Sequence, residues 1–290
     1  MRQAAIGANL WIWDSPVTTE VIRHHAPRLA GWGFDLIELP LETLDDWAAA
    51  EIGPILEQHG LKAGVCAAMG PGRDLTSLDE SVVRSTQDYL RACVDAAAGL
   101  GAKVVAGPIY SPTGVTGAIS IDEREVLITR VIENLRPLLD HSASSGVGLA
   151  VEPLNRFETS LFNTVEQTME LIRAVDHPSL GLLLDTFHMN IEERDIGAAI
   201  RLAGDRLFHF HACGNDRGAP GGDNIDWQSI RKALGDIGYD GAVSIESFTS
   251  ANQTVATAAS IWRPLANSQD DIAVDGLKFL QDLFGIDCLP

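Results

Sequence analysis

Four residues that can bind a metal ion or carry a proton stand at the ends of four short apolar segments. These residues are Glu152, Asp185, His211 and Glu246. The segment before Glu152 is short, rich in β-branched residues and bounded by Gly146 and Pro153, which is typical of a buried strand. Alternation along each strand places the polar residue at its carboxyl end on one face. Side chains delivered at the same end of four strands are expected to converge.

The four residues supply mostly oxygen ligands, with one imidazole nitrogen and no sulfur. Such a set favours Mn²⁺, Mg²⁺ or Co²⁺ in near-octahedral geometry over a structural Zn²⁺. Four protein ligands leave two positions that adjacent substrate oxygens can fill, which makes the ion a Lewis acid and an orienting template. A single acid at a strand end has an ordinary alternative as a helix cap or ion-pair partner. Four such groups buried together without a cation would repel one another, which favours a shared ion.

Strand-like and helical segments alternate along the whole chain. The expected strands are 6–12, 34–39, 61–68, 103–109, 147–151, 180–185, 206–211 and 241–246, and the expected helices are 17–33, 44–60, 79–101, 123–145, 164–175, 194–203, 227–237 and a C-terminal region to about residue 284. A long Pro/Gly/Ser/Thr-rich loop follows the fourth strand and ends near Ser120.

Eight strand–helix pairs without a break in composition predict an α/β fold, a single (β/α)8 TIM barrel spanning residues 1–290. A doubly wound sheet is the competing interpretation, but it normally carries a Gly-rich phosphate-binding turn after the first strand. The residues after Ile12 are Trp-Asp-Ser-Pro instead. Active sites of barrels form at the carboxyl ends of the strands, where the four polar residues fall.

The overall charge and the cysteines limit the classes of function. The chain has 290 residues, of which 21 are basic and 40 acidic, and its net charge is −19. This balance repels nucleic acid and anionic membranes, so neither is an expected partner. The four cysteines show no CxxC spacing, which indicates neither a zinc cluster nor a disulfide framework. No leader or long apolar span is found, and we expect a cytoplasmic protein.

Four motifs resemble the ketose 3-epimerases, the D-tagatose, D-allulose and L-ribulose 3-epimerases of the xylose-isomerase-like sugar isomerase/epimerase superfamily. The motifs are Val-Glu-Pro-Leu-Asn-Arg-Phe-Glu at 151–158, Leu-Asp-Thr-Phe-His-Met-Asn-Ile-Glu-Glu at 184–193, His-Phe-His at 209–211 with Arg217, and Ile-Glu-Ser-Phe at 245–248. The resemblance spans nearly the whole chain. It implies a xylose-isomerase-like barrel that binds a small sugar and forms a homodimer or homotetramer.

The resemblance also implies roles for single residues. Glu152, Asp185, His211 and Glu246 would bind Mn²⁺ or a similar ion, and Glu152 and Glu246 would be the catalytic acid/base pair. Inverting C3 of a ketose needs a base on one face of a planar enediolate and an acid on the other, which two carboxylates beside one ion provide.

Three more residues match positions that contact the substrate in the family: Glu158, His188 and Arg217. Alternatives exist for two of them. Arg217 could only neutralise surplus carboxylate, and Glu158 could be a partner of another site residue. His209 is expected to fill the barrel below His211. Five aromatic residues could wall the pocket or pack in the core, namely Trp11, Trp13, Phe157, Phe187 and Phe248.

Two departures from the family pattern bear on the substrate. Ala212-Cys213 replaces the usual Gly-Glu after His211, and Gly7 stands where relatives often have an aromatic residue. These changes suggest a wider pocket or a different sugar. The rival functions are an aldose–ketose isomerase or a 3-oxo-glycoside-processing enzyme on the same barrel, and a non-enzymatic sugar-binding barrel.

Overall fold

Eight parallel strands form a closed barrel in a computed structural model that describes residues 4–285. The strands follow one another in chain order, and β1 closes the barrel by pairing with β8. Their bounds are β1 (Ala5–Asn9), β2 (Leu36–Leu41), β3 (Lys62–Ala67), β4 (Val104–Gly107), β5 (Gly148–Val151), β6 (Leu180–Asp185), β7 (Leu207–Ala212) and β8 (Ala242–Ile245). The predicted (β/α)8 barrel is therefore confirmed.

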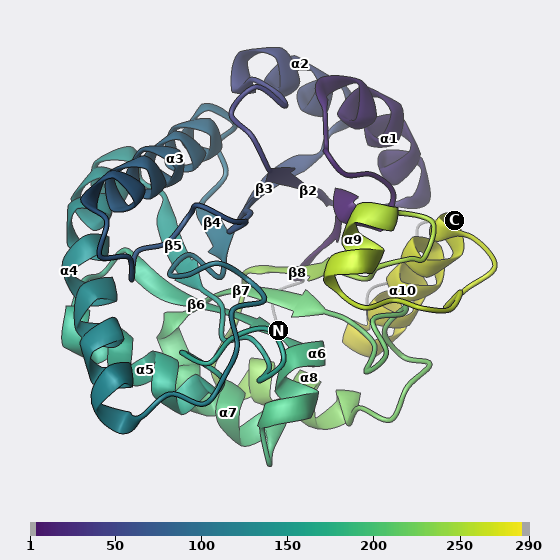
Figure 1. The fold of residues 1–290 in the computed structure, drawn as a ribbon. Helices are drawn as coiled ribbons and strands as arrows, with labels where there is room; N and C mark the ends of the chain where they lie inside the picture. Colours follow the sequence, from purple (N-terminus) through teal and green to yellow (C-terminus); the bar gives the residue numbers. More distant parts are fainter. Residues whose placement is uncertain (1–3, 286–290) are drawn as a thin grey trace.

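Helices surround the barrel (Figure 1). They are α1 (Thr19–Trp32), α2 (Ala49–His59), α3 (Glu80–Gly99), α4 (Ile121–Ser145), α5 (Val165–Val175), α6 (Thr186–Glu192), α7 (Ile196–Ala203), α8 (Trp227–Asp236), α9 (Gln253–Ala258) and α10 (Gln269–Phe284). Two short 3-10 turns, Leu10–Ile12 and Gly204–Arg206, follow β1 and precede β7. Among the described residues, none of these helices combines the length and apolar composition needed to cross a membrane.

The sequence prediction was wrong at several element boundaries. A short helix, α6, starts directly after β6, where the prediction had a loop, because Asp185 caps it by accepting the backbone N–H of Phe187. Residues 44–48 precede α2 instead of belonging to it, and the C-terminal helical region is divided into α9 and α10. The expected ends of α1 and α2 are confirmed, since Gly33 (φ 99°) and Gly60 (φ 66°) close them in the left-handed conformation.

The ring of Phe208 lies between two glycines in the lower part of the barrel. The register between β6 and β7 shifts at Leu182/Leu183. A Cβ atom built on either Gly148 or Gly181 would collide with the ring of Phe208. The small residues below Glu152 and Asp185 therefore leave room for Phe208, and the charged layer lies on a packed floor.

Candidate metal centre and active site

The four predicted ligand residues meet at the carboxyl ends of four consecutive strands. Glu152 follows β5, Asp185 ends β6, His211 lies near the end of β7 and Glu246 follows β8. One ligand atom from each side chain lies within 4.8 Å of the others. All four are at most 5% exposed. The structure thus brings together the complete set that the sequence singled out.

Unpaired buried atoms show that this cluster suits a cation. Oε1 of Glu152 and both ring nitrogens of His211 are buried and have no aligned hydrogen-bond partner. Buried polar atoms normally have partners, and three carboxylates in one buried cluster need positive charge nearby. An ion bound among these four residues would satisfy both needs, and their oxygen-rich composition fits a hard divalent cation.

Three of the ligand residues have pKa values that are shifted by burial and by their charged neighbours. Burial, followed by the neighbouring Glu246, raises the pKa of Glu152 well above its usual value. Burial also raises the pKa of Asp185 to about 6, although Arg217 acts in the opposite direction. Burial lowers the pKa of His211, but the carboxylates of Glu38 and Glu246 outweigh it and the net shift is upward. A cation bound here would therefore compete with protons for the ligand residues.

Arg217 is fixed against the ligand cluster by two charges and two rings. Its Nη1 donates to Oδ2 of Asp185 at 2.6 Å and lies 3.5 Å from Oε2 of Glu246. The guanidinium lies 4.1 Å from the ring centre of Phe187 and 4.7 Å from that of Phe248. The backbone adopts φ 68°, which is uncommon for a residue with a side chain. Arg217 does neutralise carboxylate, while its buried Nε has no partner among the described residues.

His188 lies on α6, in a segment that was expected to be a loop between the sixth strand and the helix at 194–203. Its Nδ1 accepts the backbone N–H of Asn155 at 3.1 Å, so Nε2 is the nitrogen that faces the cluster. This Nε2 lies 3.7 Å from Oε1 of Glu152 and 2.9 Å from Nη2 of Arg217. Burial, followed by Arg217, lowers the pKa of His188 well below its usual value, which keeps the ring neutral.

Glu158 contacts a residue that holds His188. Its Oε1 accepts from Nδ2 of Asn155 at 2.8 Å, and its side chain lines the cavity above the cluster. The structure therefore places Glu158 both as a partner of Asn155 and within reach of a ligand in the cavity.

Three residues beneath the cluster complete the site. Glu38 on β2 is buried between His209 and His211, and Asn9 on β1 donates to Glu38 and Glu246. His209 fills the barrel as expected, but it also contacts Glu38 at 2.6 Å. The sequence analysis missed Glu38 and Asn9. The only signal was a charged residue within the apolar second strand, in phase with Leu36.

A cavity of about 440 Å³ opens above the four ligand residues. Its charged and polar lining includes Glu42, Glu152, Glu158, His188, Arg217 and Glu246, and its apolar wall includes Trp11, Leu154, Phe157 and Phe248. Trp13 packs instead on His25 and Trp32, and Phe187 lies beside Arg217 and His188. Pockets of this size and lining are typical of small-molecule sites.

Gly7 does not widen this cavity. A Cβ atom at Gly7 would lie 2.5 Å from Cδ2 of Leu36 and 2.7 Å from Oγ of Ser244, and Gly7 is not among the residues that line the cavity. The space that a larger residue would need is filled by barrel packing. The hypothesis of a wider pocket therefore finds no support at this position.

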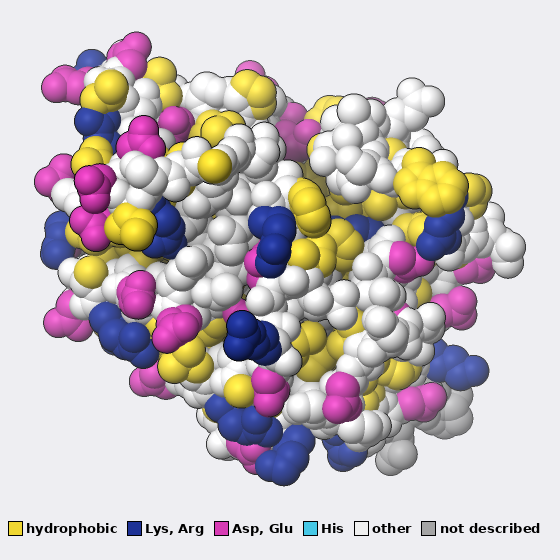
Figure 2. Space-filling model, turned by 60° about the horizontal axis from the view of Figure 1, so that its bottom comes forward, with side chains coloured by type: hydrophobic (Ala, Val, Ile, Leu, Met, Phe, Trp, Pro, Cys, Tyr) yellow, Lys and Arg dark blue, Asp and Glu magenta, His cyan; other side chains and the backbone are white. Residues whose placement is uncertain are grey.

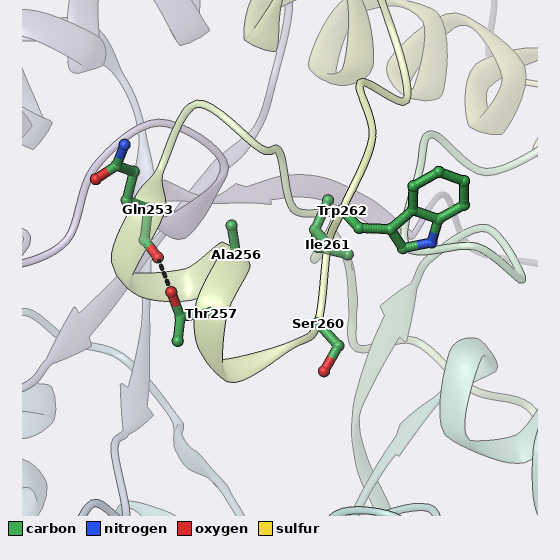
Figure 3. A pocket seen from close by; sticks show the side chains of 6 residues that line it. All are labelled: Gln253, Ala256, Thr257, Ser260, Ile261 and Trp262. Atoms are coloured by element: carbon green, nitrogen blue, oxygen red, sulfur yellow. Dashed lines mark hydrogen bonds between the residues drawn. The ribbon is translucent and has the colours of Figure 1, made fainter.

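Helix α9 separates the cavity from a second, outer recess of about 480 Å³. Thr254, Val255 and Ala258 face the cavity, whereas Gln253, Ala256 and Thr257 line the recess with 260–262. Figure 3 shows the recess and the indole of Trp262, which points away from α9. The six residues that line this recess are uncharged.

The surface seen from one side carries charges of both signs. In Figure 2, basic side chains are separated by acidic and uncharged ones, and apolar side chains line a hollow in this face. A continuous basic surface, as nucleic-acid binding requires, is not seen on this face.

Comparison with known proteins places the barrel in a family. The family model described as "Xylose isomerase-like TIM barrel" matches residues 27–283. This chain belongs to that family. Within it, the chain is 36% identical over 280 residues to a Synechocystis sp. protein named "Probable ketose 3-epimerase", and the match covers 96% of each chain. It is 31% identical to a "Ketose 3-epimerase" of Arthrobacter globiformis, again over 96% of each.

Solved structures of family members share the whole fold. The structure of D-allulose 3-epimerase from Methylomonas sp. in complex with D-allulose has a TM-score of 0.89 and 29% sequence identity to this chain. The superposition covers 97% of this chain and 98% of the other. The named relatives are isomerases that act on ketoses, which confirms the family that the motifs indicated.

Proposed function

We propose that this chain is a ketose 3-epimerase, which inverts C3 of a free ketose of the D-allulose/D-fructose, D-tagatose or L-ribulose type. One observation carries the proposal: Glu152 and Glu246, from two strands separated by β6 and β7, meet in one buried cluster at the base of a sugar-sized cavity. The relatives named as ketose 3-epimerases support it.

Glu152, Asp185, His211 and Glu246 would hold the metal ion. We propose Mn²⁺, with Mg²⁺ and Co²⁺ as alternatives, because hard oxygen donors predominate. When bound, the ion supplies Lewis acidity toward the oxygens next to the reacting carbon, which makes the hydrogen on C3 more acidic.

Glu152 and Glu246 would transfer the proton at C3. One carboxylate removes the C3 hydrogen from one face of the ketose, and the other carboxylate delivers a proton to the opposite face of the enediolate. Oε1 of Glu152 is buried and unpaired, so it would face the ion, which leaves the other oxygen of this carboxylate for the proton. Oε1 of Glu246 accepts from Nδ2 of Asn9, which fixes the direction of its carboxylate.

His188, Arg217 and Glu158 would orient the sugar. Nε2 of His188 and the guanidinium of Arg217 both face the cluster, where the oxygens around C2 and C3 of a ketose would lie. Both groups are held by other contacts before a substrate arrives, so little side-chain freedom is lost on binding. The apolar wall of Trp11, Phe157 and Phe248 would cover the less polar face of the sugar.

Substituting the two glutamates tests the acid/base assignment. We expect Glu152→Gln and Glu246→Gln each to lower kcat at least a thousandfold while the circular dichroism spectrum is unchanged, because an amide cannot exchange the proton. Glu166→Gln, at an exposed glutamate in the first turn of α5, is the matched control and should keep the activity. Near-normal turnover in either catalytic variant would refute the assignment.

The position of isotope exchange distinguishes the proposed reaction from its rivals. In D₂O, a 3-epimerase introduces deuterium at C3 of the ketose, whereas an aldose–ketose isomerase labels C1 or C2. NMR of the recovered sugar reads the position directly. Binding of the sugar without any exchange would identify a sugar-binding barrel.

We also propose that the chain forms a homodimer or homotetramer. Apolar side chains are exposed on two loops joined by a bridge between Val115 and Thr159 and at the start of α4: Val115 is 62% exposed, Phe157 73% and Ile121 78%. Burying such side chains against a second copy would be favourable. Light scattering coupled to gel filtration measures the mass, and a monomer at micromolar concentration would contradict this proposal.

A further inference from the structure

A buried carboxylate on a strand that supplies none of the four ligands lies directly beneath them. Glu38 on β2 is 1% exposed and points into the barrel interior. Isolating a carboxylate from water is strongly unfavourable unless charged and hydrogen-bonding partners compensate. Its partners therefore explain why it is tolerated there.

Both oxygens of Glu38 are engaged by histidines of β7. Oε1 lies 2.6 Å from Nε2 of His209, and Oε2 lies 2.9 Å from Nε2 of His211. The two rings meet edge to face, with centroids 5.0 Å apart and planes at 82°. The carboxylate is thus held from below by His209 and contacts His211 from the side away from the cavity.

This contact determines which nitrogen of His211 faces the ligand cluster. With Nε2 against Glu38, Nδ1 lies toward the cluster, 3.2 Å from Oε2 of Glu246. A neutral imidazole has one proton and one lone pair. A carboxylate beside Nε2 keeps the proton there, which leaves the lone pair of Nδ1 for an ion.

Asn9 connects Glu38 to the catalytic side of the cluster. Its Oδ1 accepts the backbone N–H of Trp11 at 2.9 Å, which leaves Nδ2 to face the carboxylates. Nδ2 lies 3.2 Å from Oε2 of Glu38 and 3.3 Å from Oε1 of Glu246. Two ligand residues, His211 and Glu246, are therefore held through Glu38 and Asn9.

We propose that Glu38 is a positioning residue, which orients His211 through direct contact and Glu246 through Asn9 so that the cluster is preorganised for a divalent cation. This inference rests on the proposed metal site. Glu38 is not itself placed as a ligand, because His209 occupies one oxygen and the other lies between His211 and Asn9.

Manganese binding to the metal-free protein tests the role of Glu38. The protein is stripped with a chelator, and Mn²⁺ is titrated by calorimetry into wild type and Glu38→Gln. An amide has the size of the carboxylate but only one oxygen and no charge to present to the two histidines, so we expect a Kd that is roughly 10–100-fold higher. Glu193→Gln is the matched control, since Glu193 caps α5 at the N–H of Val165 and contacts no ligand residue. Its Kd should equal that of wild type.

Kinetics separate positioning from a general structural defect. Raising the Mn²⁺ concentration should restore kcat of Glu38→Gln with the KM for the ketose unchanged, and Glu38→Asp should fall between wild type and the glutamine variant. If Glu38→Gln does not fold, His209→Leu tests the same positioning role. It removes the side chain that holds Oε1 of Glu38, so it should also weaken Mn²⁺ binding. Wild-type Mn²⁺ affinity in the folded variant would overturn the role of Glu38. Failure of wild type to bind Mn²⁺ would overturn the metal site on which it rests.

Discussion

Adding a single methyl group to the floor of the barrel should destabilise it measurably. At Gly181, a Cβ atom would lie 2.6 Å from the backbone oxygen of Arg206 and 2.6 Å from Cδ1 of Phe208. Ordinary van der Waals contacts begin at 3.4 Å, so each of these two atoms would have to move by about 0.8 Å. The nearest atom is Cγ of Phe208, which lies on the axis of ring rotation and moves only if the whole side chain moves. The backbone oxygen of Arg206, next to β7, cannot move without shifting the strand. We therefore expect Gly181→Ala to cost about 2–3 kcal/mol, the upper part of the range for overpacked cores.

Three further variants provide comparisons for the predicted cost of Gly181→Ala. A Cβ atom at Gly148 would lie 2.9 Å from ring atoms of Phe208 but at an ordinary 3.7 Å from the backbone oxygen of Lys103, so Gly148→Ala should cost about 1 kcal/mol. Gly31→Ala, in α1 with no heavy atom within 4 Å, should stabilise by about 0.5–1 kcal/mol through helix propensity. Replacing Phe208 by Leu in the Gly181→Ala background should recover at least about 1 kcal/mol through coupling between neighbours.

Urea denaturation at equilibrium, followed by circular dichroism and by tryptophan fluorescence, measures these free energies of unfolding. The slope m should be the same in all variants, so that differences in midpoint report stability. A Gly181→Ala protein as stable as wild type would refute the reasoning, as would an equal cost of the substitution with and without Phe208.

Two further predictions concern single side chains. His25 is 3% exposed, and burial lowers its pKa to about 4, so the unfolded chain binds a proton between pH 6.5 and 4 that the folded chain does not. The stability that depends on neutral His25 is thus complete above pH 6.5 and lost as the pH falls toward 4, by about 3 kcal/mol at most. Unfolding free energies between pH 7 and 4 should fall less steeply for His25→Gln than for wild type, with exposed His24→Gln as the control; parallel curves would disprove this. Arg217→Lys should lower kcat/KM about 10–100-fold in steady-state assays, because an ammonium cannot contact Asp185 and His188 with two separate nitrogens. Arg156→Lys, at an exposed arginine that pairs with Glu192, should leave kcat/KM unchanged, and equal values for both variants would contradict the role of the guanidinium.

Local patterns in the chain were enough to predict the barrel and the ligand cluster. Strand period, Gly and Pro boundaries and a polar residue at each strand end are properties of a few neighbouring residues. Glu152, Asp185, His211 and Glu246 could be named in this way because parallel strands of one barrel must end on the same side. The family motifs assigned the roles of Glu158, His188 and Arg217.

Contacts between distant segments could not be read from those patterns. Only barrel closure brings Asn9 on β1 beside Glu246, which is 237 positions later in the chain, and only the fold places Glu38 between two histidines of β7. The register shift that admits Phe208 between Gly148 and Gly181 also depends on how β6 and β7 pair. The sequence by itself determined which groups stand at the mouth of the barrel. The tertiary structure decided what supports them, because packing and buried hydrogen bonds join residues whose spacing along the chain carries no periodic signal.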